Sequence, residues 1–216
     1  MGKGSSRNGG GVRDNTAWGT GDVSGGYQAY TDPDAIQKHV GNQAWEDRLT
    51  DAEKEALDMY MNKDYAFKRM NEALRDGTVP DSDTGKLIND LGAALDDSYL
   101  KQNIVVARRT TPELFGGADT PTEIRKMYGD IVTDPAFLSS SAKVDYKAYQ
   151  NTRPMELHIK VSGRQRGVGA YVQHFAENTD EYEFLFNRGS SFRILGAYAQ
   201  GGKTHVNLEY VGRYKS

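Results

Sequence analysis

The stretch 180–186 near the C-terminus, with the sequence DEYEFLF, carries residue types that could do chemistry. Glu181 and Glu183 alternate with aromatic residues, and residues two apart lie on the same face of a β-strand. The spacing therefore predicts two neighbouring carboxylates on one face of a strand. Two such anions repel each other, so one of them needs a raised pKa, a hydrogen-bonding neighbour or a cationic ligand. The alternative is an edge strand whose acidic face is solvated, because acidic residues protect sheet edges.

Two further polar elements lie at the ends of expected strands. Arg108 and Arg109 end the β-rich run 104–108, and the serines 139–141 end the short run 137–141. Guanidinium groups bind phosphate and carboxylate groups through paired hydrogen bonds. Serine hydroxyl groups can donate to a carboxylate, although three serines in a row are also typical of a loop.

Helices are expected before the strands. Residues 50–53 have the form of a capping box, and apolar residues recur behind them at helical spacing. A second helix is predicted from Asp64 to a glycine cap at Gly77, and a third follows the loop 78–81. We interpret the apolar stripes of these helices as core.

The remaining strands follow the helices, which predicts an α+β fold instead of a series of βαβ units. The expected strand segments are 104–108, 137–141, 155–161, 169–172, 180–186, 192–195 and 205–211, with a hairpin turn at 200–203. No glycine-rich phosphate-binding fingerprint opens a helix after a strand.

Composition excludes several classes of protein. With 216 residues, 37% of them hydrophobic, the chain can bury one core, and a net charge of -3 lacks the basic excess of a nucleic-acid-binding domain. The absence of cysteine excludes disulfides and thiolate chemistry and favours a reducing cytosol as the place of action. The four histidines, His39, His158, His174 and His205, show no metal spacing, so no metal is expected.

Residues 1–30 form a glycine-rich stretch with no apolar segment of the kind found in a signal peptide. We expect a flexible tail there, followed by a single domain over residues 31–216. No apolar run is long enough for a membrane span, so no membrane partner is expected.

Taken in order, the arginine, serine and Glu-x-Glu elements resemble the Arg, Ser-Thr-Ser and Glu-x-Glu signatures of mono-ADP-ribosyltransferases. The chain is most similar to the branch with the enzymatic components of clostridial binary toxins and vegetative insecticidal proteins. The segments 104–116, 169–171 and 181–194 carry the resemblance, which extends over roughly residues 49–211. It implies the ADP-ribosyltransferase fold, with a helical N-terminal lobe packed on a split, mostly antiparallel β core.

The resemblance also implies a reaction and roles for single residues. The reaction is transfer of ADP-ribose from NAD to an acceptor with release of nicotinamide. Glu183 matches the catalytic glutamate, and a carboxylate beside the ribose would stabilise its developing positive charge. Ser139 matches the hydroxyl that orients this glutamate, and Arg108 matches the arginine that binds the NAD pyrophosphate. Arg109 is a second candidate for cofactor binding or a solvated neighbour.

Other positions match the family pattern less closely. Arg153 lies at a suitable distance along the chain for the family's further phosphate-binding arginine, and Tyr149 in the same loop is the aromatic residue available for the nicotinamide end. Ser140 replaces the family's central threonine, and Ala136 stands where the family has an asparagine.

Acceptor choice is assigned to Glu181. In the family, a glutamate at this first position accompanies transfer to arginine, and a carboxylate pairs well with a guanidinium group. Phe175, in the preceding loop, is expected to help recognise the acceptor.

The expected function is therefore NAD-dependent mono-ADP-ribosylation of arginine side chains, with a protein as the acceptor. Two alternatives remain: a NAD glycohydrolase toxin, in which water replaces the acceptor, and a phage or virion-associated protein with the same fold. The same motifs fit a glycosyltransferase that acts as a toxin, an effector or a bacteriophage enzyme. Neither a metal nor nucleic acid is expected as a partner.

Overall fold

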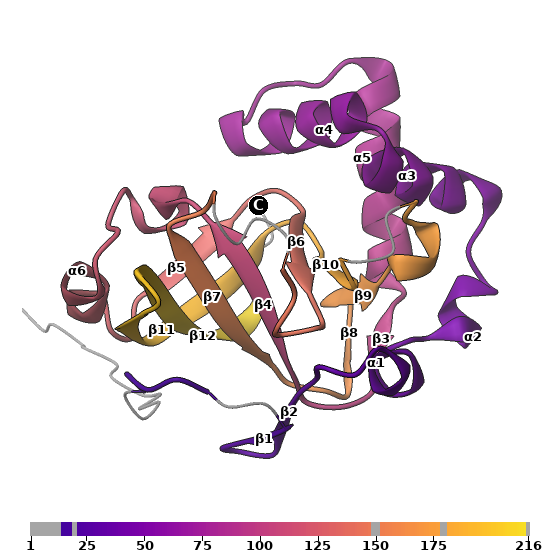
Figure 1. Ribbon diagram of the computed structural model, residues 1–216. Coiled ribbons are helices and arrows are strands. Elements are labelled where there is room, and N and C mark those ends of the chain that lie inside the picture. The colour runs from indigo at the N-terminus through magenta and orange to yellow at the C-terminus, as the bar shows by residue number, and fades with distance from the viewer. Residues whose placement is uncertain (1–13, 19–20, 148–151, 178–180, 215–216) are drawn as a thin grey trace, which may run out of the picture.

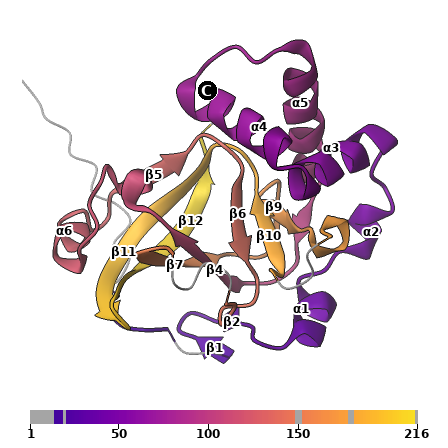
Figure 2. The ribbon, with the colours of Figure 1, turned by 45° about the horizontal axis from the view of Figure 1, so that its top comes forward.

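A computed structural model describes residues 14–18, 21–147, 152–177 and 181–214 of the chain. The first half of the molecule is mainly helical (Figure 1). Its helices are α1 (Pro33–His39), α2 (Gln43–Glu46), α3 (Asp51–Asn62), α4 (Asp64–Asp76) and α5 (Ser82–Asp96). In Figures 1 and 2, α3, α4 and α5 form a lobe beside one part of the sheet.

The boundaries of these helices follow local side-chain chemistry. Thr50 caps α3 by accepting from the backbone N–H of Glu53, whose carboxylate accepts from the N–H of Thr50, so the predicted capping box is present. Helix α4 ends at Gly77, which has the left-handed φ of 64° that glycine adopts without steric cost. The Asp81 carboxylate caps α5 through the N–H of Thr84.

The second half of the chain is mainly β-structure. Its strands are β3 (Tyr99–Leu100), β4 (Ile104–Thr110), β5 (Ile131–Asp134), β6 (Leu138–Ser141), β7 (Met155–Val161), β8 (Gln165–Arg166), β9 (Gly169–Tyr171), β10 (Glu183–Phe186), β11 (Ser190–Gln200) and β12 (Lys203–Arg213). Between them lie α6 (Pro121–Lys126) and the short 3-10 turns η1 (Pro112–Phe115) and η2 (Gln173–Phe175). The predicted hairpin turn between β11 and β12 is confirmed.

The main sheet has the order β5-β11-β12-β7-β4-β6-β10-β9. Most pairs are antiparallel, but β7 and β12 run parallel. The two parts of the sheet meet between β4 and β6, where Ala107 and Ser141 are the only paired residues among those described. This weak junction divides the β core, as expected for a split fold, and Figure 2 shows β6, β9 and β10 turned away from the other strands. The α+β prediction is confirmed.

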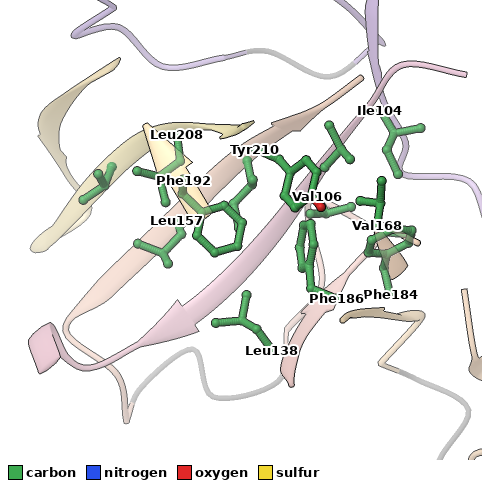
Figure 3. Close-up of a cluster of buried hydrophobic side chains, with 14 of the residues drawn as sticks. Ile104, Val106, Leu138, Leu157, Val168, Phe184, Phe186, Phe192, Leu208 and Tyr210 are labelled. Carbon is green, nitrogen blue, oxygen red and sulfur yellow. The ribbon is translucent and has the colours of Figure 1, made fainter. Parts of the chain in front are cut away.

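Apolar side chains from both parts of the sheet fill the core (Figure 3). Phe184 and Phe186 of β10 meet edge to face, with ring centroids 5.1 Å apart, and Phe186 also contacts Phe192 and Tyr210. A second cluster joins α3, α4 and α5 to the other face of β9 and β10, where Leu185 is buried against it. Burial on both faces therefore fixes the position of β10.

Strand β10 differs from its prediction in two respects. It begins at Glu183, because Tyr182 has a left-handed φ of 50° that interrupts the extended backbone, so Glu181 lies before the strand. The edge-strand alternative is wrong, because β10 pairs with β6 on one side and β9 on the other.

The prediction of a flexible tail over residues 1–30 does not hold for all of the segment. Residues 21–23 and 27–29 form the strands β1 (Gly21–Val23) and β2 (Tyr27–Ala29), and β2 pairs with β4. The backbone carbonyls of Asp14 and Thr16 accept hydrogen bonds from the buried Asn207 amide. Residues 1–13 and 19–20 lie outside the described part of the chain.

Sequence reasoning also missed several short elements: α1, α2, α6, β3, β5 and β8. They are too short to show a period, and tertiary contacts hold them in place. Within the described residues, no helix has the length and apolar character needed to cross a membrane.

Candidate active site

A cleft of about 320 Å³ lies where the helical lobe meets the sheet. The helices and the sheet each contribute to its walls, and a second hollow of about 370 Å³ shares Arg75 and Arg108 with it. Residues lining the cleft include Tyr60, Asn71 and Arg75 from the helices and Arg108, Arg109, Ser139, Arg153, Glu181 and Glu183 from the β half. The structure thus gathers six of the eight predicted site residues in one place.

Glu183 is the most deeply placed carboxylate of the cleft, with 7% of its surface exposed. Its backbone is held by the N–H of Val172, which donates to its carbonyl, and by the side-chain carbonyl of Gln173, which accepts from its N–H. Burial raises the pKa of Glu183 to about 7; the Ser139 hydroxyl, which donates to the carboxylate, works in the opposite direction. Nearby Glu181 raises this pKa further and Arg108 lowers it.

The three serines of β6 each hold a different part of the glutamate segment. Ser139 contacts the carboxylate of Glu183, as predicted for it. The Ser140 hydroxyl donates to the Phe184 carbonyl at 2.7 Å, and the Ser141 hydroxyl donates to the Glu181 carbonyl at 2.7 Å. The serine run therefore fixes the position of both glutamates, a role for Ser140 and Ser141 that sequence reasoning missed.

Glu181 reaches the cleft from irregular backbone, not from the strand face on which the alternation placed it. The turn at Tyr182, whose carbonyl accepts from the N–H of Ala142 at 2.9 Å, brings the Glu181 side chain back to the same cleft as Glu183. Glu181 is half-buried, and this burial raises its pKa. The predicted proximity of the two carboxylates is confirmed, although its structural cause is different.

Arg108 is anchored at the junction of the two parts of the sheet. Its guanidinium donates to the backbone carbonyl of Ser139. Burial lowers the pKa of Arg108, but an arginine side chain keeps its charge under physiological conditions. The same residue thus provides a fixed positive charge next to the Ser139–Glu183 pair.

Arg109 also lines the cleft, but its guanidinium is held by contacts with other residues of the chain. Its Nε donates to Glu156 at 2.9 Å, and its guanidinium lies 4.3 Å from the centroid of the Tyr146 ring and donates to the Tyr146 carbonyl. These contacts hold β4, β7 and the segment after β6 together. The solvated alternative for Arg109 is wrong, since only 7% of its side chain is exposed.

The remaining predicted residues have different outcomes. Arg153 is exposed and lines the cleft. Tyr149 lies outside the described residues. Phe175 packs edge to face on Trp45, with centroids 6.4 Å apart, as part of the helical cluster, and its neighbour Ala176 lines the cleft. The proposed contact of Phe175 with an acceptor therefore stays a prediction.

Sequence reasoning missed the helical wall of the cleft. The Tyr60 hydroxyl of α3 accepts a hydrogen bond from the Asn71 side-chain amide of α4 at 2.9 Å, and the side-chain oxygen of Asn71 accepts from the backbone N–H of Phe137. Arg75 pairs with Asp134 through two hydrogen bonds of 3.2 and 3.0 Å. Polar residues at 71 and 75, one turn apart on an otherwise apolar face, were the available signal.

Ala136, at the position of the family asparagine, is fully buried, and its N–H donates to Asp134. It cannot supply an amide side chain to the cleft. The Asn71 amide lines the same cleft from the opposite wall.

A model of the ADP-ribosyltransferase exoenzyme family matches residues 39–212. The chain belongs to this family. The match covers the cleft and both lobes of this ADP-ribosyltransferase. A search of curated proteins by sequence finds no match.

Solved structures show the same fold. The C3 exoenzyme of Clostridium limosum superposes with a TM-score of 0.72 at 17% identity, covering 86% of this chain and 98% of that protein. C3stau2 of Staphylococcus aureus, solved with NAD, gives a TM-score of 0.71 at 14% identity, with 87% and 99% covered. The enzymatic component C2-I of the Clostridium botulinum C2 toxin gives 0.65 at 21% identity, covering 81% of this ADP-ribosyltransferase but 46% of C2-I. The predicted resemblance to clostridial toxin enzymes is confirmed.

Proposed function

We propose that this ADP-ribosyltransferase transfers a single ADP-ribose from NAD to arginine side chains of a protein. The observation that carries the proposal is the pair of carboxylates in one cleft. One of them, Glu183, is buried and held by Ser139, while the other, Glu181, is more exposed. The two differ in environment in the way that two different chemical tasks require.

The first task is cleavage of NAD. The bond between ribose C1′ and the nicotinamide nitrogen breaks, its electron pair goes to that nitrogen, and neutral nicotinamide leaves. Positive charge then develops on the ribose, and the ionised carboxylate of Glu183 stabilises it more than it stabilises the ground state. The Ser139 hydrogen bond favours the ionised form and fixes its direction.

Binding of NAD is assigned to the cationic side of the cleft. Arg108 has a fixed guanidinium beside the Ser139–Glu183 pair, which suits the pyrophosphate. Arg153 provides a second positive charge at the same cleft, and the adjoining hollow that shares Arg108 extends the space for an elongated dinucleotide. A relative of the same fold, C3stau2, was solved with NAD.

The second task is capture of the sugar cation by the acceptor. A guanidinium nitrogen of the target arginine forms the new bond to C1′, and the proton that it loses passes to Glu181 or to solvent. Because burial raises the pKa of Glu181, this carboxylate is better suited to accept a proton than an exposed one. Glu181 also pairs with the incoming guanidinium.

The test compares two reactions in two variants. NAD hydrolysis and transfer of labelled ADP-ribose to agmatine, a small arginine analogue, are measured in the wild type, Glu181→Gln and Glu183→Gln. In Glu183→Gln both reactions should fall by about 100-fold or more, because one electrostatic contact with the transition state is lost. Glu181→Gln should lose transfer and keep most hydrolysis, because water needs no steering.

Each alternative has its own outcome in this test. Hydrolysis by the wild type with no transfer to agmatine or to lysate proteins would identify a NAD glycohydrolase. An equal loss of both reactions in Glu181→Gln would contradict the separate roles of the two glutamates. Absence of NAD turnover in a folded wild-type protein would favour a non-enzymatic role of the fold.

A further inference from the structure

A second cluster of polar residues lies on the sheet face opposite the apolar core. Strands β7 and β12 run parallel, with His205 paired to Glu156 and Asn207 paired to His158. Residues two apart in a strand share a face, so the pairing brings Glu156, His158 and His205 together. The alternate residues of the same strands are fully buried in the core, among them Leu157 and Val206.

The donor atoms of the three side chains converge. Nε2 of His158 lies 3.0 Å from Nδ1 of His205 and 3.6 Å from Oε1 of Glu156, and one ligand atom from each residue lies within 4.8 Å of the others. A tetrahedral zinc ion with bonds of about 2.0 to 2.1 Å holds neighbouring ligand atoms roughly 3.3 Å apart. The 3.0 and 3.6 Å distances lie on either side of that value, and the remaining pair of ligand atoms lies within 4.8 Å, so a modest side-chain rearrangement brings all three atoms to one ion.

The outer contacts of the cluster orient these atoms for coordination. Nε2 of His205 lies 3.2 Å from the Gln200 carbonyl, which can only accept, so this nitrogen donates and Nδ1 keeps its lone pair in the neutral ring. The second oxygen of Glu156 accepts from Arg109, which leaves Oε1 towards His158. Metal-bound histidines and carboxylates have outer partners of this kind.

Packing around the cluster keeps the rings in place and leaves a route of entry. The rings of His158 and His205 are nearly parallel with centroids 5.4 Å apart, and the Tyr198 ring lies 4.9 Å from His205 and 6.3 Å from His158. The Tyr198 hydroxyl lies 3.3 Å from Nε2 of His158. His158 is buried, with 8% of its surface exposed. His205 is half-buried, so an ion can enter from its side.

We propose that Glu156, His158 and His205 form a binding site for a divalent transition-metal ion, with Zn²⁺ as the best fit. Two imidazoles and one carboxylate are ligands that zinc prefers, whereas Mg²⁺ and Ca²⁺ prefer oxygen ligands. The ion replaces the hydrogen bond between the two histidines, and the hydrogen on Nε2 of His158 moves to the other nitrogen of its ring. Bound there, the ion links β7 to β12. This site is independent of the proposed transfer reaction.

The chain suits a direct binding measurement, because it has four histidines and no cysteine. The full-length protein, free of any histidine tag and treated with a chelator, is titrated with Co²⁺ and then with Zn²⁺. We expect one Co²⁺ per chain, visible absorption bands of a low-symmetry four-coordinate ion, and displacement by one equivalent of Zn²⁺. Zn²⁺ should also raise the thermal unfolding midpoint.

Variants separate this site from adventitious binding. His205→Ala should weaken Zn²⁺ binding by more than the 10- to 100-fold typical of an outer-sphere change and should remove the thermal shift. His205→Gln serves as a second variant if the alanine protein does not fold. The matched controls are His39→Ala and His174→Ala, whose histidines contact Tyr30 and Glu46 away from the cluster.

The possible results decide for or against the site. Stoichiometric binding that is lost with His205 and kept in both controls supports it. No saturable binding of either ion by the folded wild type overturns it, and the cluster is then a hydrogen-bonded network only. Binding that persists unchanged in both His205 variants also overturns it.

Discussion

Glu183 illustrates at the residue scale how burial and function oppose each other. In the proposed reaction its carboxylate must be ionised to stabilise a sugar cation, yet its burial raises its pKa to about 7. Ser139 and Arg108 offset part of this effect by favouring the ionised form. A raised pKa in a cleft, with a named charge partner, is typical of a functional carboxylate.

The pH dependence of NAD hydrolysis tests this state of Glu183. Because the ionised form is the active one, kcat/KM should rise about tenfold per pH unit below pH 7 and level off above it. Steady-state rates from pH 5 to pH 9 on protein shown to be folded measure this profile. A profile that is flat between pH 5 and pH 8 would contradict the raised pKa.

Ionisation of Glu183, which the proposed reaction needs, should lower the stability of the folded protein. The folded-state pKa of about 7 exceeds the ordinary value of 4.5, so Glu183 contributes stability below pH 4.5 that is lost as pH rises through 7. At pH 8.5 the unfolding free energy of Glu183→Gln, measured with denaturant, should therefore exceed that of the wild type by up to roughly 3 kcal/mol. At pH 4.5 the two unfolding free energies should be nearly equal. An equal difference at both pH values would show that charge burial is not the cause.

Substitutions of Arg108 and Arg109 should have different effects on NAD affinity. Arg108→Lys should weaken NAD binding by about 10- to 100-fold, because an ammonium group cannot reproduce two parallel hydrogen bonds to phosphate. Arg109→Lys is the matched control: its main contacts are Glu156 and Tyr146, so it should lower stability more than affinity. Calorimetric titration with NAD and thermal unfolding distinguish the two, and the reverse pattern would move the phosphate contact to Arg109.

At the element scale, the pair β6–β10 carries the residues of the proposed catalytic site. Each serine of β6 contacts β10 or the residues just before it, and β10 is buried on both faces. The left-handed backbone at Tyr182 then turns Glu181 into the cleft. The spacing of the two carboxylates is thus set by hydrogen bonds between neighbouring segments, in addition to the strand itself.

Ser141→Ala tests this role of the serine run. It removes the hydroxyl that donates to the Glu181 carbonyl, so transfer to agmatine should fall several-fold more than hydrolysis, with a stability loss of about 1 to 2 kcal/mol. Ser140→Ala is the control, because its hydroxyl makes an equally short bond to the Phe184 carbonyl, away from Glu181, and its loss should leave the ratio unchanged. The ratio of the two rates is the measured quantity, and an equal ratio in both variants would contradict the positioning role.

The cleft is a property of the whole molecule, because it forms only where the helical lobe and the sheet meet. The helical lobe contributes Tyr60, Asn71 and Arg75, whereas the sheet contributes the arginines, the serine and the glutamates. On the opposite face of the sheet, residues 14–18 and the β1–β2 hairpin cover the polar residues of β7 and β12 and the apolar residue Val105. This N-terminal segment is part of the packed structure.

Truncation tests the role of that segment. Removal of residues 1–30 uncovers Val105 and takes away the two carbonyls that accept from Asn207. We expect a loss of about 2 to 4 kcal/mol in unfolding free energy, while the rate of NAD hydrolysis per folded molecule is kept, because no cleft residue is removed. Removal of residues 1–13 is the control, and denaturant unfolding is the measurement. Equal stability of both truncated proteins would instead support the prediction of a flexible tail over residues 1–30.

Local features of the sequence determined much of this protein. The capping box at Thr50, the cap at Gly77 and the alternation in β7 act over a few residues, so their outcome could be predicted without a structure. The arginine, serine and Glu-x-Glu elements, in order, identified the family that the comparison confirms. Non-local contacts decided the rest. The burial that raises the pKa of Glu183, the helical wall with Asn71 and the meeting of His158 with His205 all join segments far apart in the chain, and only the tertiary fold brings such segments together.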